Sequence, residues 1–274
     1  MNEPLLTDFI NYLLNEKKLA ESTVNSTRNA AIKALKYAKK KKLIPNLDFE
    51  EIPRAGDISK ERGVLTRKEV DALFGLEWPS IRSRIASLIA AYTGMRMGEI
   101  RSLRVCDIHS GYIDVKHGWG KKRGRKETKN QEVRQIPILP KVSAEIQGYI
   151  QQRGLKEPGD LLLPGKNPLV PYNNRQIGKD FNKMLEKIGI DDKTRKERGI
   201  VFHSWRHRMA KTLAENNTPK DIGKKILGHK TDRMYDHYAS HCNDETLKIE
   251  EKYINLAFRQ DMPEKEVPPL HGAV

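Results

Sequence analysis

Apolar residues recur at helical spacing in two stretches near the start of the chain. Residues 5–14 predict a short helix, and residues 22–42 predict a longer one with lysines at many of its polar positions. A run of four lysines, residues 39–42, fits either a solvated helix end favoured by the helix dipole or a phosphate contact. Pro45, Pro53 and Gly56 then interrupt the pattern, so residues 46–63 are expected to form a linker.

From residue 64 onward the pattern predicts a larger and mainly helical part. Thr66 and Glu69 have the spacing of a capping box, which places the start of a helix near residue 67. Residues 112–115 and 132–138 alternate as strands do, and the Gly-, Lys- and Arg-rich residues between them predict a hairpin with a basic tip. Helices are expected at residues 67–74, 81–92, 97–103, 141–153, 173–188, 203–216, 219–227, 232–238 and 244–258.

The predicted fold class is therefore mainly α with a small antiparallel β-sheet (α+β). Residues 1–57 are expected to form a short helical segment, whose linker runs to about residue 63. Residues 64–258 are expected to form the main domain, and residues 259–274, which contain three prolines, a loose tail.

The charge balance points to a polyanionic partner. Lys and Arg number 51 against 36 Asp and Glu, which gives a formal net charge of +15 and favours nucleic acid. The two cysteines form no CxxC motif, which is typical of a reducing compartment. Because no signal-peptide pattern is present and the most apolar stretch, residues 85–95, is shorter than the ~20 residues of a membrane span, we expect a cytoplasmic protein without membrane contact.

Several common chemistries lack their motifs in this sequence. There is no GxxxxGK[ST], no GxGxxG at a strand–helix junction, no GxSxG and no HExxH. His203 and His207, like His237 and His241, have a spacing that can seat zinc, but no nearby carboxylate completes a ligand set. Neither a metal ion nor another cofactor is expected.

Five motifs in order resemble those of the tyrosine recombinase, or phage integrase, family. Residues 93–103, TGMRMGEIRSL, resemble its first arginine motif, and residues 203–207, HSWRH, resemble its HxxRH. Residues 227–229, LGH, are followed nine residues after His229 by Tyr238 at the usual spacing of the nucleophile. Residues 127–129, ETK, followed by IP at 136–137, resemble the hairpin that carries the catalytic lysine. Trp205 stands where the family usually has leucine, and we expect it to pack inward.

The resemblance implies a role for each matching residue. Arg96 and Arg206 would clamp the scissile phosphate of DNA, and Glu99 would hold the guanidinium of Arg96. His203 would assist proton transfer, and His229 would donate to a non-bridging oxygen. His207 would support this group, since it completes the HxxRH pattern.

Two further residues would carry the bond-breaking step. Tyr238 would attack the phosphate and store the phosphodiester as a 3′-phosphotyrosyl ester, so that strands rejoin without ATP. Lys129 would protonate the 5′-oxygen leaving group. Tyr235 is the geometric alternative to Tyr238, but the spacing from the LGH motif selects Tyr238. The neighbouring basic residues of the hairpin tip are expected to contact DNA: Lys121, Lys122, Arg123, Arg125 and Lys126.

A site-specific recombinase or integrase is thus the predicted function, with double-stranded DNA as partner. The resemblance also implies a homotetramer on DNA, assembled through the helix at residues 244–258, although packing of that helix within its own chain fits the pattern equally. The N-terminal segment matches only the second half of the family's four-helix core-binding domain. Two alternatives remain: a non-catalytic DNA-binding relic of an integrase, and a type IB topoisomerase-like relaxing enzyme.

Overall fold

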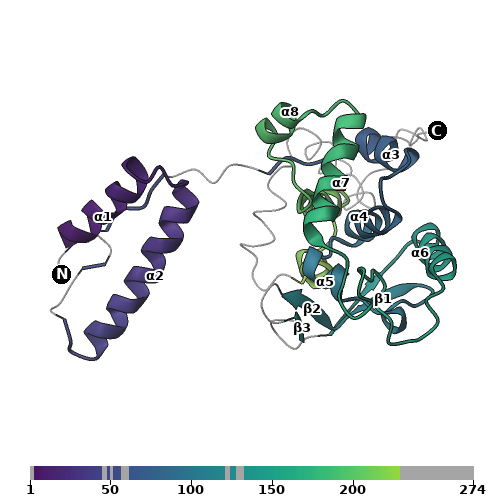
Figure 1. Ribbon diagram of the computed structural model, residues 1–274, viewed down its shortest axis with the longest axis horizontal. Helices are drawn as coiled ribbons and strands as arrows, with labels where there is room; N and C mark the ends of the chain where they lie inside the picture. Colours follow the sequence, from purple (N-terminus) through teal and green to yellow (C-terminus); the bar gives the residue numbers. More distant parts are fainter. Residues whose placement is uncertain are drawn as a thin grey trace, which may run out of the picture. The chain divides into compact units, whose positions relative to one another are not determined.

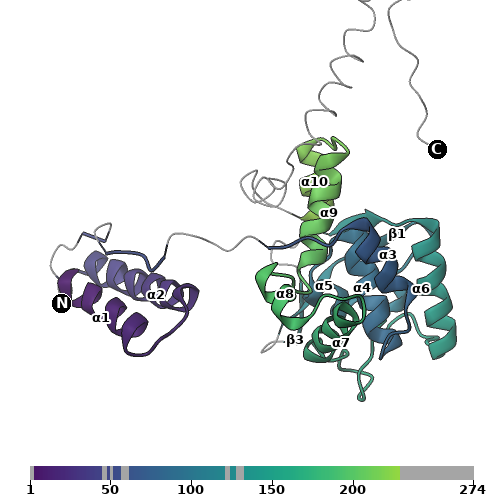
Figure 2. The same cartoon turned by 90° about the horizontal axis from the view of Figure 1, so that it is seen from above.

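The computed structural model describes residues 3–44, 48–49, 52–56, 62–120, 124–127 and 133–228. The chain divides into two compact units, Met1–Lys60 and Glu61–Val274. Figures 1 and 2 show the helical smaller unit and the mixed larger one. None of the helices in the described ranges combines the length and the apolar character that a bilayer crossing requires.

The smaller unit is a pair of helices, α1 (Glu3–Asn15) and α2 (Glu21–Lys40), which pack side by side. Part of the stretch expected to be a linker belongs to the core of this unit, because Phe49, Ile52 and Ala55 are buried with the apolar residues of the two helices. Asn25 on α2 pairs with both backbone groups of Ala55, at 2.6 and 3.0 Å. These bonds satisfy the non-helical backbone, so residues 52–55 follow α2 rather than extend freely.

Helix α4 (Ile81–Thr93) is the central helix of the larger unit. It is buried on most sides and contacts α6 (Pro140–Arg153), α7 (Asn174–Lys187) and α9 (Ser204–Glu215). The unit also contains α3 (Arg67–Gly75), α5 (Met97–Ser102), the 3-10 turn η1 (Val105–Asp107), α8 (Asp192–Glu197) and α10 (Lys220–Leu227). The sequence pattern does not predict α8, a six-residue helix without buried residues.

Two of the local expectations are confirmed. Helix α3 begins at the predicted capping box, in which Thr66 N donates to Glu69 Oε2 at 2.7 Å and Glu69 N donates to Thr66 Oγ1 at 3.3 Å. Trp205 is buried and packs against Phe74 and Phe181, with ring centroids 5.8 and 5.5 Å away. Trp205 therefore anchors α9 in the core.

The β-structure consists of two short antiparallel pairs. Strand β1 (Tyr112–Val115) pairs with β4 (Arg134–Pro137), with Ile113 opposite Ile136. Strand β2 (His117–Gly120) pairs with β3 (Gly124–Glu127), so the basic segment of the predicted hairpin forms a second pair beyond the first. The predicted fold class, mainly helical with a small amount of antiparallel sheet, is confirmed.

Candidate active site

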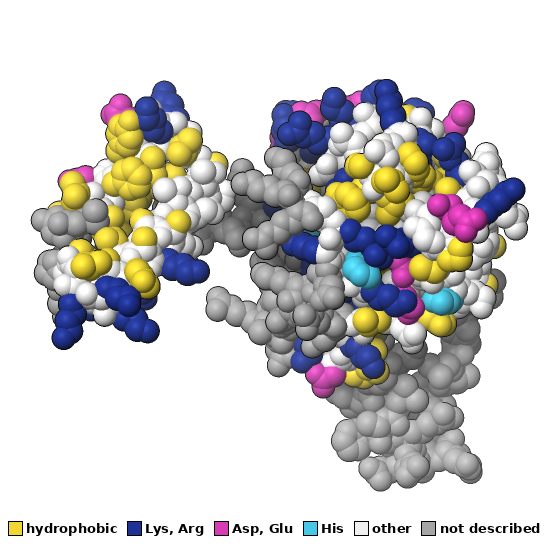
Figure 3. All heavy atoms as spheres, turned by 60° about the horizontal axis from the view of Figure 1, so that its bottom comes forward, with side chains coloured by type: hydrophobic (Ala, Val, Ile, Leu, Met, Phe, Trp, Pro, Cys, Tyr) yellow, Lys and Arg dark blue, Asp and Glu magenta, His cyan; other side chains and the backbone are white. Residues whose placement is uncertain are grey.

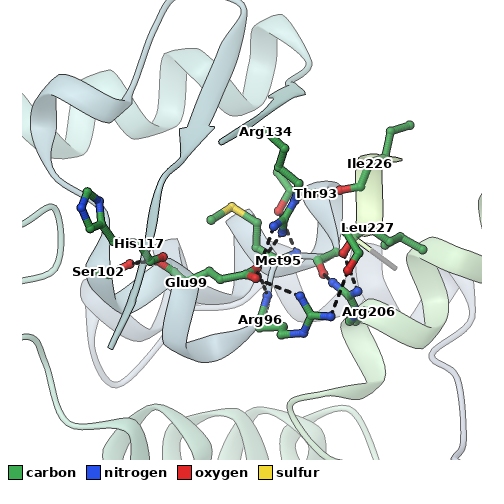
Figure 4. A network of polar contacts seen from close by, with 12 residues as sticks. Thr93, Met95, Arg96, Glu99, Ser102, His117, Arg134, Arg206, Ile226 and Leu227 are labelled. Atoms are coloured by element: carbon green, nitrogen blue, oxygen red, sulfur yellow. Dashed lines mark hydrogen bonds and ion pairs between the residues drawn. The ribbon is translucent and has the colours of Figure 1, made fainter. Parts of the chain in front are cut away.

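Three arginine side chains meet at the C-terminal end of α10. Arg96 Nη2 donates to the carbonyl oxygen of Gly228 at 3.2 Å, and Arg134 Nε donates to that of Ile226 at 3.3 Å. Arg206 Nη2 donates to the carbonyl oxygen of Leu227. The last carbonyls of a helix lack partners within the helix and carry its partial negative charge, so they attract guanidinium groups. Figure 4 shows the three side chains reaching this turn from different segments.

A glycine ends α4 at the point where α10 approaches it. Gly94 has a φ of +64°, and a Cβ atom there would lie 2.5 Å from Leu227 Cδ2. Its carbonyl oxygen accepts a hydrogen bond from Arg206 Nη1 at 2.9 Å. Position 94 thus requires glycine both for its backbone conformation and for the close approach of α10.

Glu99 joins two of the arginines. Its Oε1 accepts from Arg96 Nη1 at 2.9 Å, and its Oε2 accepts from Arg134 Nη2 at 2.7 Å and from the backbone N of Arg96 at 2.9 Å. The Glu99 side chain is only 9% exposed. Burial by itself would raise the pKa of Glu99, but the charge and hydrogen bonds of Arg134, together with those of Arg96, lower the pKa overall. Glu99 is therefore a buried carboxylate that stays ionised.

Arg134 is a site residue that the sequence interpretation missed. Its side chain is 11% exposed, against 39% for that of Arg96. A signal was present in the strand pattern: Arg134 lies two residues before Ile136, so both point to the same face of β4, and Ile136 is buried. A charged residue on the apolar face of a strand needs a buried partner of opposite charge.

The histidines of the HSWRH motif lie at the start of α9. His203 is the N-cap residue, and its ring centroid lies 5.4 Å from that of the buried His207. Arg206 between them is 1% exposed. Burial lowers the pKa of His203 to about 4, and the positive charges of Arg206 and Arg96 act in the same direction. At neutral pH His203 is thus a neutral imidazole that can accept a proton.

Basic side chains gather on one face of the larger unit. Figure 3 shows Lys and Arg side chains gathered there around histidine and acidic groups. Of the predicted hairpin contacts, Arg125 and Lys126 lie on β3, where Arg125 is partly buried and Lys126 is exposed. Among the described residues, no three His, Cys, Asp or Glu side chains are grouped as a metal site would require.

The structure brings five of the predicted site residues together: Arg96, Glu99, His203, Arg206 and His207. Glu99 binds Arg96, the charges of Arg96 and Arg206 both lower the pKa of His203, and the rings of His203 and His207 lie 5.4 Å apart. The other predicted site residues lie outside the described residues: Lys121, Lys122, Arg123, Lys129, His229 and Tyr238. The same holds for the predicted helices at residues 232–238 and 244–258 and for the tail at 259–274.

Comparison with known proteins gives three kinds of match. The model of the phage integrase family matches residues 63–245. Tyrosine recombinase XerA of Pyrococcus furiosus is 28% identical over 171 residues, which cover 60% of this chain and 52% of XerA. Transposase B from transposon Tn554 of Staphylococcus aureus is 26% identical over 213 residues, which cover 76% of this chain and 31% of the transposase. The chain thus spans about half, or less, of the length of these two relatives.

Solved structures share the fold. The integrase of transposon Tn1549, determined in complex with transposon right end DNA, superimposes with a TM-score of 0.74 at 20% identity and covers 93% of this chain and 85% of that one. The XerH site-specific recombinase bound to a difH substrate gives 0.67 at 17% identity, with 96% and 73% covered. The family match covers the Arg96 motif, HSWRH, LGH and Tyr238, so the chain belongs to the phage integrase family, as its motifs predict.

Proposed function

We propose that this chain is a site-specific DNA recombinase that cuts and rejoins strands through a 3′-phosphotyrosyl intermediate, without ATP or a metal ion. The observation that carries the proposal is the convergence of Arg96 and Arg206 on the turn at Leu227 and Gly228. His229 follows this turn directly in the sequence, and Tyr238 comes nine residues later. The Tn1549 protein that shares the fold is an integrase bound to DNA, which supports the same interpretation.

Charge stabilisation falls to the two arginines. The guanidinium of Arg96 is partly exposed, and Glu99 restricts its orientation, so it is prepared for a phosphate oxygen. Arg206 is buried, so water screens its positive charge only weakly. Preorganised donors of this kind stabilise the charge that develops on the non-bridging oxygens in the transition state.

Residues of this chain can supply and accept the protons that DNA cleavage requires. The oxygen of Tyr238 attacks phosphorus, the bond from phosphorus to the 5′-oxygen breaks, and Lys129 protonates that oxygen as it leaves. The phenol, whose ordinary pKa is about 10, gives its proton to His203 or to water. His203 is neutral at pH 7 but a weak base, and the negative charge of a bound phosphate would raise its pKa toward that of an effective proton acceptor. Rejoining is the reverse reaction, in which the free 5′-hydroxyl attacks the phosphotyrosyl ester.

The DNA partner and the assembly follow from the same proposal. Residues 64–258 act as the catalytic domain, and residues 1–57 add a short helical DNA-binding segment rich in lysine. The basic residues from Lys121 to Lys126 contact the DNA backbone. Four chains assemble on two DNA sites through the segment at residues 244–258, whose apolar positions contact a neighbouring chain.

The test is a covalent-trapping assay on duplex DNA that carries candidate repeats from the surroundings of the gene, nicked next to the cleavage site so that the released strand end diffuses away. The unaltered protein should form a covalent DNA adduct, and mass spectrometry should place the nucleotide on Tyr238. Tyr238→Phe should bind the same DNA and form no adduct, whereas Tyr235→Phe should form it.

Each alternative has its own outcome in this assay. Binding without any adduct would indicate a non-catalytic DNA-binding protein. Relaxation of a supercoiled plasmid without the repeats, by a monomer, would indicate a topoisomerase-like enzyme. An adduct on Tyr235, or one that persists in Tyr238→Phe, would contradict the assignment of the nucleophile.

A further inference from the structure

Arg134 connects three segments that are far apart in the sequence. Its Nη2 and Nη1 donate to Oε2 and Oε1 of Glu99 at 2.7 and 3.3 Å, and its Nε donates to the carbonyl oxygen of Ile226 at 3.3 Å. Paired hydrogen bonds from a guanidinium to both oxygens of a carboxylate set direction as well as strength. One side chain of β4 therefore tethers the first turn of α5 to the last turn of α10 (Figure 4).

The tether is built into the surrounding backbone. Gly228 ends α10 with a φ of +65°, and a Cβ atom there would lie 3.0 Å from Arg134 Nη1. The glycine of the LGH motif thus leaves room for the Arg134 guanidinium while it turns the chain out of the helix. A bulkier residue at 228 would press on Arg134 as well as strain the turn.

Glu99 serves two arginines whose surroundings differ. Arg134 is almost enclosed, whereas Arg96 keeps a substantial exposed surface. Without Arg134, the buried carboxylate would retain Arg96 as its charged partner among these three residues, and the two side chains could shift together. With Arg134 in place, one unit of positive charge remains in excess, and it lies at the exposed end on Arg96.

We propose that Arg134 is a positioning residue for DNA cleavage, which holds Glu99 and the end of α10 so that the guanidinium of Arg96 stays in place for the phosphate. The inference rests on the proposed recombinase function. All three guanidinium nitrogens of Arg134 donate to Glu99 or to the Ile226 carbonyl, so the effect of Arg134 on the phosphate passes through these two groups.

The test compares Arg134→Lys with Arg134→Gln in single-turnover adduct formation and in DNA binding. A lysine keeps the charge but has a single ammonium group, which cannot donate to both carboxylate oxygens and the carbonyl at the same time. We expect Arg134→Lys to bind DNA within about threefold of the unaltered protein and to form the adduct about 100-fold more slowly, the size of loss that a misplacement of about 1 Å produces. Arg134→Gln should be slower still.

Arg84→Lys is the matched control. Arg84 forms a partly buried ion pair with Glu145, between α4 and α6 of the same unit and apart from the candidate site. Arg84→Lys should lose about as much stability as Arg134→Lys and keep the rate of adduct formation of the unaltered protein. A common loss in both variants, or a normal rate in Arg134→Lys, would overturn the proposal.

A second readout does not depend on cleavage. Hydrogen exchange in the free protein, followed on peptides from α5 and α10, should quicken in Arg134→Lys and remain unchanged in Arg84→Lys, because only the first removes the tether. If the unaltered protein formed no adduct on any DNA, the proposed function would fail, and the exchange of α10 would still decide whether Arg134 holds this turn. Unchanged exchange in Arg134→Lys would refute the tether.

Discussion

The side chain of Leu227 occupies the space in which a Cβ atom of residue 94 would lie. The distance from that Cβ position to Leu227 Cδ2 is 2.5 Å, and the carbonyl of Gly94 and that of Leu227 both bind the guanidinium of Arg206. The end of α4, the end of α10 and Arg206 on α9 therefore form one packed junction. Small changes at this junction should act on the arginine cluster more than on the rest of the fold.

Gly94→Ala tests this junction. Gly154→Ala is the matched control, because Gly154 ends α6 with nearly the same φ, +63°, and no heavy atom of the described residues lies within 4 Å of a Cβ there. Both variants should lose about 1 kcal/mol from the left-handed backbone. Gly94→Ala should lose about 1–3 kcal/mol more through overpacking, and its adduct formation should slow, as measured by urea unfolding and covalent trapping. Equal losses in the two variants would show that the packing against Leu227 does not matter.

The lowered pKa of His203 predicts a pH dependence of stability. In the unfolded chain the imidazole has an ordinary pKa near 6.5, and in the folded protein it is about 4. The unfolded state therefore binds more protons between these values, so the stabilising effect is complete above pH 6.5 and is lost as the pH falls toward 4. The loss amounts to at most about 3 kcal/mol, since one pKa unit corresponds to ~1.4 kcal/mol.

Urea unfolding of the unaltered protein and of His203→Gln at pH 7 and pH 4.5 measures this effect. The free energy of unfolding of both proteins should decrease as the pH is lowered, and the decrease should be smaller for His203→Gln. Parallel curves would mean that His203 titrates alike in the folded and unfolded states.

Lys129 should act as the general acid. Lys129→Ala should slow cleavage of an ordinary 5′-oxygen leaving group by about 100-fold or more, and slow a 5′-thio substrate far less, because a thiolate leaves without protonation. Single-turnover rates on the two substrates provide the comparison. Equal slowing on both would exclude Lys129 from this role and make Lys126 the next candidate.

The basic hairpin should contribute to DNA affinity by binding phosphates. Replacing Lys121, Lys122, Arg123, Arg125 and Lys126 by glutamine should weaken binding to many sequences alike. For each phosphate that is no longer neutralised, the slope of log affinity against log salt should become shallower by about 0.9. Binding titrations at several salt concentrations measure the slope, and an unchanged slope would rule out phosphate binding by these residues.

Local patterns in the sequence were sufficient for much of the fold and for the family. Helical periodicity places α2, α4, α7 and α9, and the Thr66–Glu69 spacing locates the start of α3, because these features depend on neighbours within one or two turns. The order of the arginine, HSWRH and LGH motifs identifies the phage integrase family. The burial of Trp205 was also expected from its apolar side chain.

Long-range packing decided the rest. Nothing in the local pattern pairs Arg134 with Glu99 and Ile226, which lie 35 and 92 residues away, or places Phe49 and Ile52 in a core instead of a linker. The C-terminal end of a helix attracts any suitably placed cation, so the sequence alone cannot choose which arginines reach that end of α10. Only the folded chain brings Arg96, Arg134 and Arg206 to the carbonyls at the end of α10, because the packing of α9 and β4 against α10, and of α4 against α9, sets those distances.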